Sequence, residues 1–158
     1  MTGIPSILSP HGRSHGFLLL PQEVAQLPRA TDNYPVLAFR EIYATTGVIG
    51  LRIGDSAKEL AGRPVRIRGY MAPPLIDQGN FFILTRSPVI TCPFCDPSAG
   101  WPDDVVLVHL EQDSRFIDPA QMIEVAGCLE IGAKLDEHTG MMRLVRLRDG
   151  QWHLPPNR

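Results

Sequence analysis

Two cysteines three positions apart are the residues of this chain whose types and spacing point most directly to chemistry. Cys92 and Cys95 stand in the segment "TCPFCDPSAGWPDD". Two thiolates at this spacing can reach one ion from a tight loop, with Zn–S distances of about 2.3 Å. A structural zinc site has four ligands, so the pair supplies half of one. The spacing predicts a metal half-site.

The remaining ligands must come from nearby side chains or from another molecule. Asp96 follows Cys95 directly, and Asp103 and Asp104 close the same segment. A second Cys-x-x-C pair from another copy of the chain would complete a Cys₄ site across a two-fold axis. We therefore expect a zinc ion bound by Cys92, Cys95 and Asp96, or a homodimer that shares the ion through the cysteine loop.

The other thiol and the best-placed histidine fit such a site poorly. Cys128 is expected on the outward face of its strand. His109 is four residues from Val105, which places it about 13 Å along an extended strand from the end of the loop. Neither side chain reaches the pair easily if the strands form a barrel.

Two other interpretations of the pair stay open. "CPFC" copies the active-site tetrapeptide of glutaredoxin-like thiol–disulfide proteins, but the following "DPSAGWP" cannot continue the helix that such a site requires. The cysteines could instead be small residues packed in a proline-braced loop. The length of the connection favours a functional loop over a plain one, because compact domains mostly use short connections.

Composition bounds the class of protein. The chain has 158 residues, 44% of them hydrophobic, which is enough for one domain with a sizeable core. Acidic residues number 17 and basic residues 15, so no net charge draws the whole molecule to nucleic acid or anionic lipid. No segment approaches the roughly 18 apolar residues of a membrane span. The sequence as written predicts a cytoplasmic protein.

The first 33 residues and the rest of the chain differ in pattern. Residues 1–33 are rich in Pro, Gly, Ser and His and are predicted to form an extended or mobile arm, whereas 34–158 are predicted to form a single domain. In "DSAKELAGR", Ser56 and Glu59 have the capping-box spacing and Gly62 stands where a helix would stop, so one or two helical turns are expected. The apolar segment "YPVLAFREIYATTGVIGLRI" fits either a short helix or strands, and its part "REIYATTGVIGLRI" favours strands.

Five strand candidates follow this short helix. They are "RPVRIRGYM", "NFFILTR", "DVVLVHL", "MIEVAGCLEIG" and "GMMRLVRLRDG". The first and fourth carry a glycine after an alternating apolar pair, as expected of the bends that close a small barrel. The pattern predicts a mainly β fold, a small five-stranded OB-like Greek-key barrel in which the helix between the third and fourth strands shrinks to the turn "DPAQ". A small open sandwich is the alternative.

Barrels of this type often bind single-stranded nucleic acid through basic grooves and aromatic platforms. Arginines gather on the first and last predicted strands: Arg66, Arg68, Arg143, Arg146 and Arg148. Tyr70, Phe81 and Phe82 could offer stacking, although arginines on a solvated face and phenylalanines in the core would give the same pattern. The acidic balance of the chain makes nucleic-acid binding the less favoured function.

A combination of segments resembles a known family. Gly62 to Pro73 matches the pattern G-x-x-V-x-I-x-G-[FY]-M-x-P, and "FFILTR", a cysteine-containing loop, "VVLVHL" and "IEVAGCLEIG" follow. Over roughly residues 59–148 the chain is similar to an uncharacterised bacterial family of small OB-like proteins, sometimes encoded beside ABC-transporter permeases. The resemblance implies a non-enzymatic accessory role involving metal, an ABC-transporter partner and a periplasmic location. The resulting hypothesis is a binding protein rather than an enzyme.

Overall fold

The computed structural model describes residues 30–45, 50–73, 78–91, 102–135, 140 and 142–155. The helices are the 3₁₀ turn η1 (Ala30–Asn33), α2 (Phe39–Ile42) and α3 (Asp55–Glu59). The strands are β1 (Tyr43–Thr45), β2 (Arg52–Ile53), β3 (Pro64–Met71), β4 (Gln78–Thr85), β5 (Val105–Arg115), β6 (Met122–Leu135) and β7 (Met142–His153). The predicted mainly β fold is confirmed, and each of the five strand candidates forms one of the strands β3 to β7.

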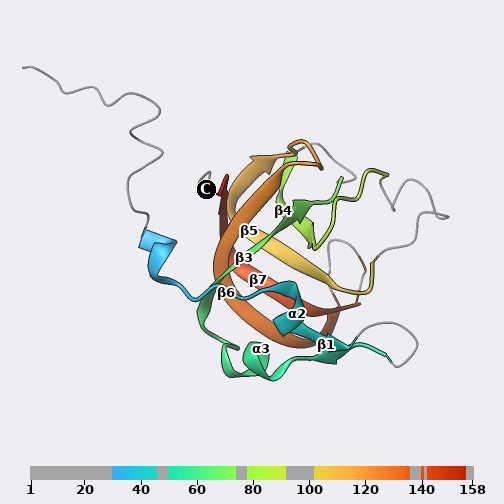
Figure 1. Ribbon diagram of the computed structural model, residues 1–158. Coiled ribbons are helices and arrows are strands. Elements are labelled where there is room, and N and C mark those ends of the chain that lie inside the picture. Colours follow the sequence, from blue (N-terminus) through green and yellow to red (C-terminus); the bar gives the residue numbers. More distant parts are fainter. Residues whose placement is uncertain are drawn as a thin grey trace, which may run out of the picture.

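These five strands form one mixed sheet that closes on itself (Figure 1). Its order is β3-β4-β5-β7-β6, and β6 pairs again with β3. Four of the pairs are antiparallel, while β5 and β7 run parallel. Because β6 and β7 are the longest strands, their hairpin extends beyond the end of β3, whose last pair on that side is Pro64↔Cys128.

Two strand glycines allow the sheet to bend, as their positions in the sequence suggested. A Cβ on Gly69 would lie 2.5 Å from the carbonyl oxygen of Thr85 and 3.0 Å from the ring of Phe39. The β6–β7 register shifts between Ala126 and Cys128, and the extra residue of this bulge lies on β7, between Arg148 and Gln151, opposite Gly127. Only a residue without a side chain fits the close approach at Gly69.

The apolar pattern of each strand follows from what covers its faces. In β3, Val65, Ile67 and Met71 are buried in the main core. The alternate residues Arg66, Arg68 and Tyr70 face outward and are only partly buried. Strand β5 begins with four consecutive buried residues because its outer face is covered too: Val105 and Leu107 pack with Ile83 in a second, smaller cluster. The main core fills the inside of the barrel.

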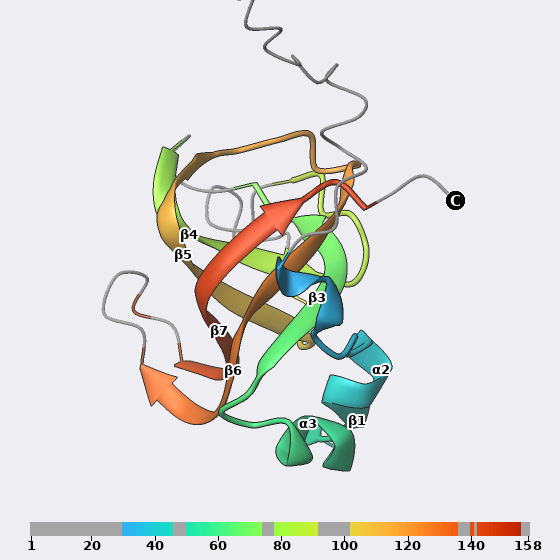
Figure 2. The same cartoon turned by 90° about the vertical axis from the view of Figure 1, so that its left-hand side faces the viewer.

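The segment that precedes α3 covers one end of the barrel. In two views at right angles, α2, α3 and β1 lie together at the same end (Figures 1 and 2). Leu37, Phe39 and Ile42 belong to the main core, so this segment packs with the barrel as one hydrophobic unit. The backbone N–H of Leu37 donates to the carbonyl of Arg66 at 2.8 Å, which fixes the segment alongside β3.

Some local predictions need correction. The beginning of "REIYATT" is the helix α2 and not a strand, because Phe39 and Ile42 bury one helical face. Helix α3 begins at Asp55 after Gly54, so Ser56 is not its cap; Gly54 is required because a Cβ there would meet the carbonyl oxygen of Glu41 at 2.2 Å.

Two other local predictions, the helix stop at Gly62 and the turn "DPAQ", are confirmed. Gly62 follows α3 with φ +77°, and "DPAQ" is a turn in which the Asp118 carboxylate accepts the N–H of Ala120 at 2.8 Å. The arm predicted for 1–33 lies outside the described residues except at its end, where residues 30–33 form η1.

Candidate functional site

The predicted metal ligands Cys92, Cys95 and Asp96 lie outside the described residues, but both ends of their segment are described. Thr85 and Val105 are paired residues at the end of the β4–β5 ladder. Next to them, the Arg86 guanidinium lies 3.2 Å from the carboxylate of Asp104. The chain therefore leaves and re-enters the barrel at one point, which an ion pair closes.

Tyr43 ties this point to the segment that covers the end of the barrel. Its hydroxyl donates a hydrogen bond to the carbonyl oxygen of Val105 at 2.5 Å. Burial raises the pKa of Tyr43 above its ordinary value of 10.0, and the neighbouring Asp104 charge adds to this effect. Because the phenol stays protonated, it acts as a permanent hydrogen-bond donor that holds the start of β5.

Strand pairing places the other two candidate ligands away from the cysteine segment. Cys128 is opposite Pro64 on β3, six residues from Tyr70, which pairs with Thr85; this is about 20 Å along the strand. His109 is four residues along β5 from Val105, or about 13 Å. Within the described ranges, no group of three or more His, Cys, Asp or Glu side chains could hold a metal ion.

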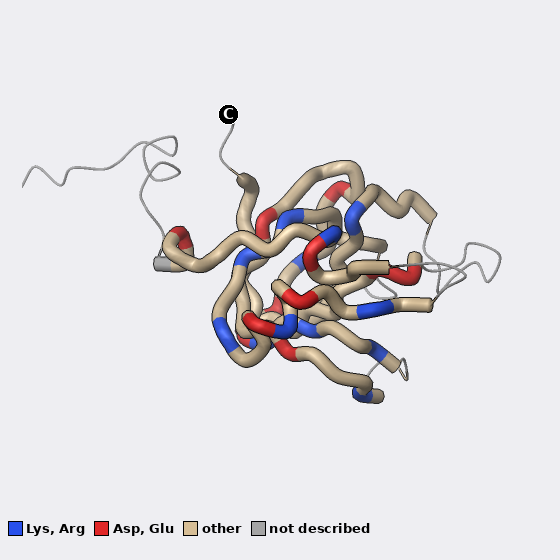
Figure 3. Tube along the Cα trace, turned by 60° about the horizontal axis from the view of Figure 1, so that its bottom comes forward, with Lys and Arg blue, Asp and Glu red and all other residues tan. Residues whose placement is uncertain are grey.

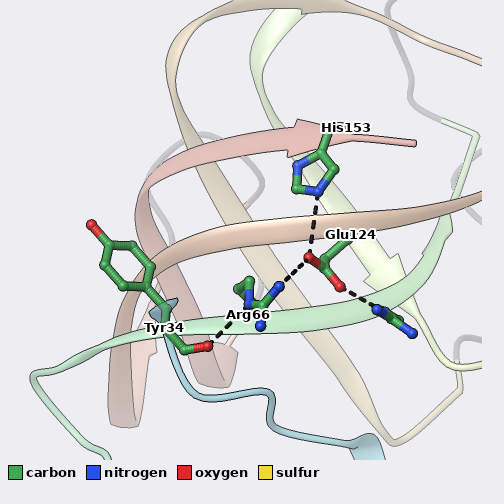
Figure 4. Close-up of polar contacts among 5 residues, drawn as sticks. Tyr34, Arg66, Glu124 and His153 are labelled. Atoms are coloured by element: carbon green, nitrogen blue, oxygen red, sulfur yellow. Dashed lines mark hydrogen bonds and ion pairs between the residues drawn. The ribbon is translucent and has the colours of Figure 1, made fainter. Parts of the chain in front are cut away.

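A buried carboxylate is the centre of the most concentrated charge cluster of the described residues, which we call the Glu124 cluster (Figure 4). The side chain of Glu124 is only 1% exposed. Its Oε1 accepts from Nη1 of Arg66 at 3.0 Å, and its Oε2 accepts from Nε of Arg68 at 2.6 Å. Nε2 of His153 lies 3.3 Å from Oε1.

The Glu124 cluster joins three distant parts of the chain. Glu124 is on β6, its arginines are on β3, and His153 ends β7. The Nε of Arg66 also donates to the carbonyl of Tyr34 at 3.0 Å, in the segment that docks beside β3. Burial raises the pKa of Glu124, but the hydrogen bond from Arg68 and the charges of both arginines outweigh it and hold the pKa below 4.5. The carboxylate is therefore ionised in its buried position.

A second cluster, the Glu130 cluster, lies on the same strand. Oε2 of Glu130 lies 3.3 Å from Nε of Arg146, and Oε1 lies 2.5 Å from Nε of Arg148. Here the carboxylate side chain is 28% exposed. Burial raises the pKa of Glu130, yet the hydrogen bond from Arg146 and the charge of Arg148 hold it below its ordinary value.

These clusters account for most of the arginines that the sequence places on the first and last barrel strands. Acidic and basic residues lie interspersed along the barrel in place of a face of one sign (Figure 3). Arg66, Arg68, Arg146 and Arg148 each pair with a glutamate, so in the described part of the chain these four arginines do not form the unpaired basic groove that a nucleic-acid backbone requires. Phe82 is buried in the core, so it offers no stacking platform.

Sequence reasoning did not single out Glu124, Glu130 or His153 as parts of charge clusters. The alternation of β6 does place Glu124 and Glu130 on its outward face, but which arginines they meet depends on the register with β3 and β7. An acidic residue at an outward position between apolar neighbours was the available signal.

Comparison with known proteins adds one structural neighbour. No family model matches the sequence, and no curated protein matches it either. The fold is similar to that of a DUF3299 family protein from Pseudomonas aeruginosa PAO1, with a TM-score of 0.51 and 13% sequence identity. The match covers 79% of this chain and 98% of that one. The likeness is one of fold, to a protein of an uncharacterised bacterial family, which agrees in part with the resemblance seen in the sequence.

The described helices are all short. None of them has the length and apolar character that crossing a lipid bilayer requires.

Proposed function

We propose that this protein is a non-enzymatic binding protein that holds a zinc ion through Cys92 and Cys95. The spacing of the thiols suits one tetrahedral ion. The observation that carries the proposal is the closed base of their segment, where Arg86 and Asp104 pair and Tyr43 holds Val105. A connection whose ends are fixed this way limits the positions that two cysteines near its start can take, and this lowers the entropy cost of gathering ligands.

The closed base of the cysteine segment also bears on which aspartates could join Cys92 and Cys95 as zinc ligands. Asp104 is only 8% exposed and already pairs with Arg86, so removing it from that pair would leave a cation without its partner. Asp103 is exposed. The ligand set that we propose is Cys92, Cys95 and Asp96, or two cysteine pairs from two copies of the chain.

We further infer that the barrel is of the OB type. The support is its strand order, because β7 lies between β5 and β6 and the fourth barrel strand therefore crosses over before pairing. The accessory role beside an ABC transporter, in the periplasm, follows from the resemblance over residues 59–148 and is part of the same proposal. Fold alone does not carry it.

The test is the metal content of protein purified without a histidine tag, measured by mass spectrometry together with a count of free thiols. We expect zinc that is lost in Cys92→Ser and kept in the matched control Cys128→Ser, since Cys128 lies about 20 Å from the base of the segment. Half a zinc per chain in a dimer that dissociates on loss of metal would identify the shared Cys₄ site. One zinc per monomer would instead indicate that Asp96 or another oxygen ligand completes the site.

Two outcomes would overturn the proposal. A metal-free protein with a Cys92–Cys95 disulfide would instead indicate a redox or bracing pair. A metal-free protein with three unreactive thiols would indicate a packed loop.

A further inference from the structure

A cavity of about 370 Å³ lies beside the Glu130 cluster, on the outward face of β6 and β7. One wall is the turn at Ala61 and Gly62 that connects α3 to β3, and the other is formed by side chains of the two strands. The N–H of Gly62 donates to the carbonyl of Leu129 at 2.7 Å, so the turn is held against β6. This volume lies within the range of small-molecule sites, about 300–1,000 Å³.

Arg146 is the fixed element of this cavity. Its side chain is 9% exposed, and its Nη1 donates to the carbonyl oxygens of Gly132 at 2.9 Å and Arg143 at 3.1 Å, while its Nε contacts Glu130. The guanidinium has five N–H donors, and in the described part of the chain its Nη2 donates to no protein group. A buried cation held in one orientation therefore keeps donors for a ligand.

The charges around the cavity are unbalanced. Among the described residues, Arg148 and Lys134 line it together with Arg146, and Glu130 is the one carboxylate of that lining. Arg148 is 53% exposed and is oriented by Glu130. Three cations against one anion leave an excess of two positive charges, which matches a phosphate group better than a single carboxylate.

We propose that this cavity binds the phosphate group of a small ligand, with Arg146 and Arg148 as the donors that orient it and Lys134 as an additional cation. Glu130 acts as a positioning residue because its two carboxylate oxygens hold the guanidinium groups of Arg146 and Arg148. The site is independent of the cysteine segment, so it stands whether or not that segment binds zinc.

Cys128 provides a reporter at the cavity. It lines the cavity and lies directly opposite Arg148 in the β6–β7 ladder. In a Cys92→Ser/Cys95→Ser variant it is the single thiol of the chain. Its alkylation by neutral iodoacetamide would be timed in increasing inorganic phosphate, at ionic strength held constant with chloride.

We expect phosphate to slow the alkylation saturably. The apparent affinity should fall about tenfold in Lys134→Gln/Arg148→Gln, and it should not change in the matched control Arg115→Gln, which removes an exposed arginine of β5 outside the cavity. In the unmodified chain, NMR spectra should show phosphate-dependent shifts of the amides of Gly62 and Leu129.

This second measurement keeps the test valid if the cysteine variant does not fold. Alkylation rates and amide shifts that depend only on ionic strength would overturn the proposal. So would equal phosphate affinity in the double variant, because the cations named would then not be the binding groups.

Discussion

The Glu124 and Glu130 clusters are built from the same parts and have opposite characters. Both carboxylates stand on the outward face of β6, six residues apart, and each pairs with two arginines that alternate along a neighbouring strand. The arginines of Glu124 come from β3 and those of Glu130 come from β7. The exposed fraction of the carboxylate side chain is 1% in one and 28% in the other.

The difference comes from what lies over each cluster. Over Glu124, the segment from Tyr34 to Leu37 docks beside β3, and His153 reaches the carboxylate from the end of β7. Near Glu130, the pairing of β6 with β3 has ended at Cys128, and the hairpin continues without that neighbour. Coverage by distant segments thus makes one ion cluster structural and leaves the other accessible beside a cavity.

The largest expected effect is on stability. Glu124→Gln leaves Arg66 and Arg68 in place around a neutral amide, and breaking a buried ion pair on one side costs about 3–5 kcal/mol. In a domain of this size the Tm should fall by at least about 6 °C in thermal unfolding followed by circular dichroism. Glu130→Gln is the matched control and should cost clearly less, since water can solvate Arg148 and Arg146 keeps its hydrogen bonds to two backbone carbonyls. Equal losses in the two variants would show that burial does not separate the clusters.

The second expected effect is a dependence on pH. The pKa of Glu124 is held below 4.5 in the folded protein, so its charge stabilises the fold above about pH 4.5 and that contribution is lost as the pH falls through the folded value. The difference in unfolding free energy between the wild type and Glu124→Gln should therefore be largest near pH 7 and narrow towards about pH 3 in urea titrations. A difference that stays constant over this range would contradict the role given to the charge.

The smallest expected effect is on the response to salt. Arg148 is half-exposed and Arg66 is largely buried, so screening should reach the first ion pair and not the second. The change in Tm caused by Arg148→Gln should be small and should vanish in about 1 M salt. The change caused by Arg66→Gln should persist, because its partner remains buried. If salt reduced the loss of Tm equally in both variants, the two ion pairs would not differ in burial as described.

The elements of the barrel could be predicted because their signals are local. Alternation in "RPVRIRGYM" reports a strand with one buried face, and Gly69 marks a bend that the structure places against Thr85. The sequence favoured strands where α2 ("FREI") forms, because four residues are too few to show a helical period. Ser56 was misread as a cap because a close contact elsewhere, at Gly54, decides where α3 begins.

The two candidate sites differ in the same respect: the cysteine pair has a local signal in the sequence, and the cavity beside Glu130 has none. Cys92 and Cys95 are visible in the sequence as a pair because their spacing is itself the signal, and zinc binding there stays a prediction. The cavity beside Glu130 could not be predicted, since it combines the turn at Gly62 with residues of two strands more than 60 positions away. In the sequence, Arg66 and Arg68 are compatible with a nucleic-acid-binding face. The β3–β6 register instead places both arginines against the carboxylate of Glu124.

The sequence by itself therefore determined which segments become strands, where glycine lets them bend and which two thiols lie three positions apart. These properties depend on neighbours within a few residues. Only the tertiary structure decided that β6 lies between β3 and β7, that Glu124 is buried and that Glu130 is left accessible. The physical reason is that charge pairing and burial depend on strand register and on covering segments, and both are set when the sheet closes.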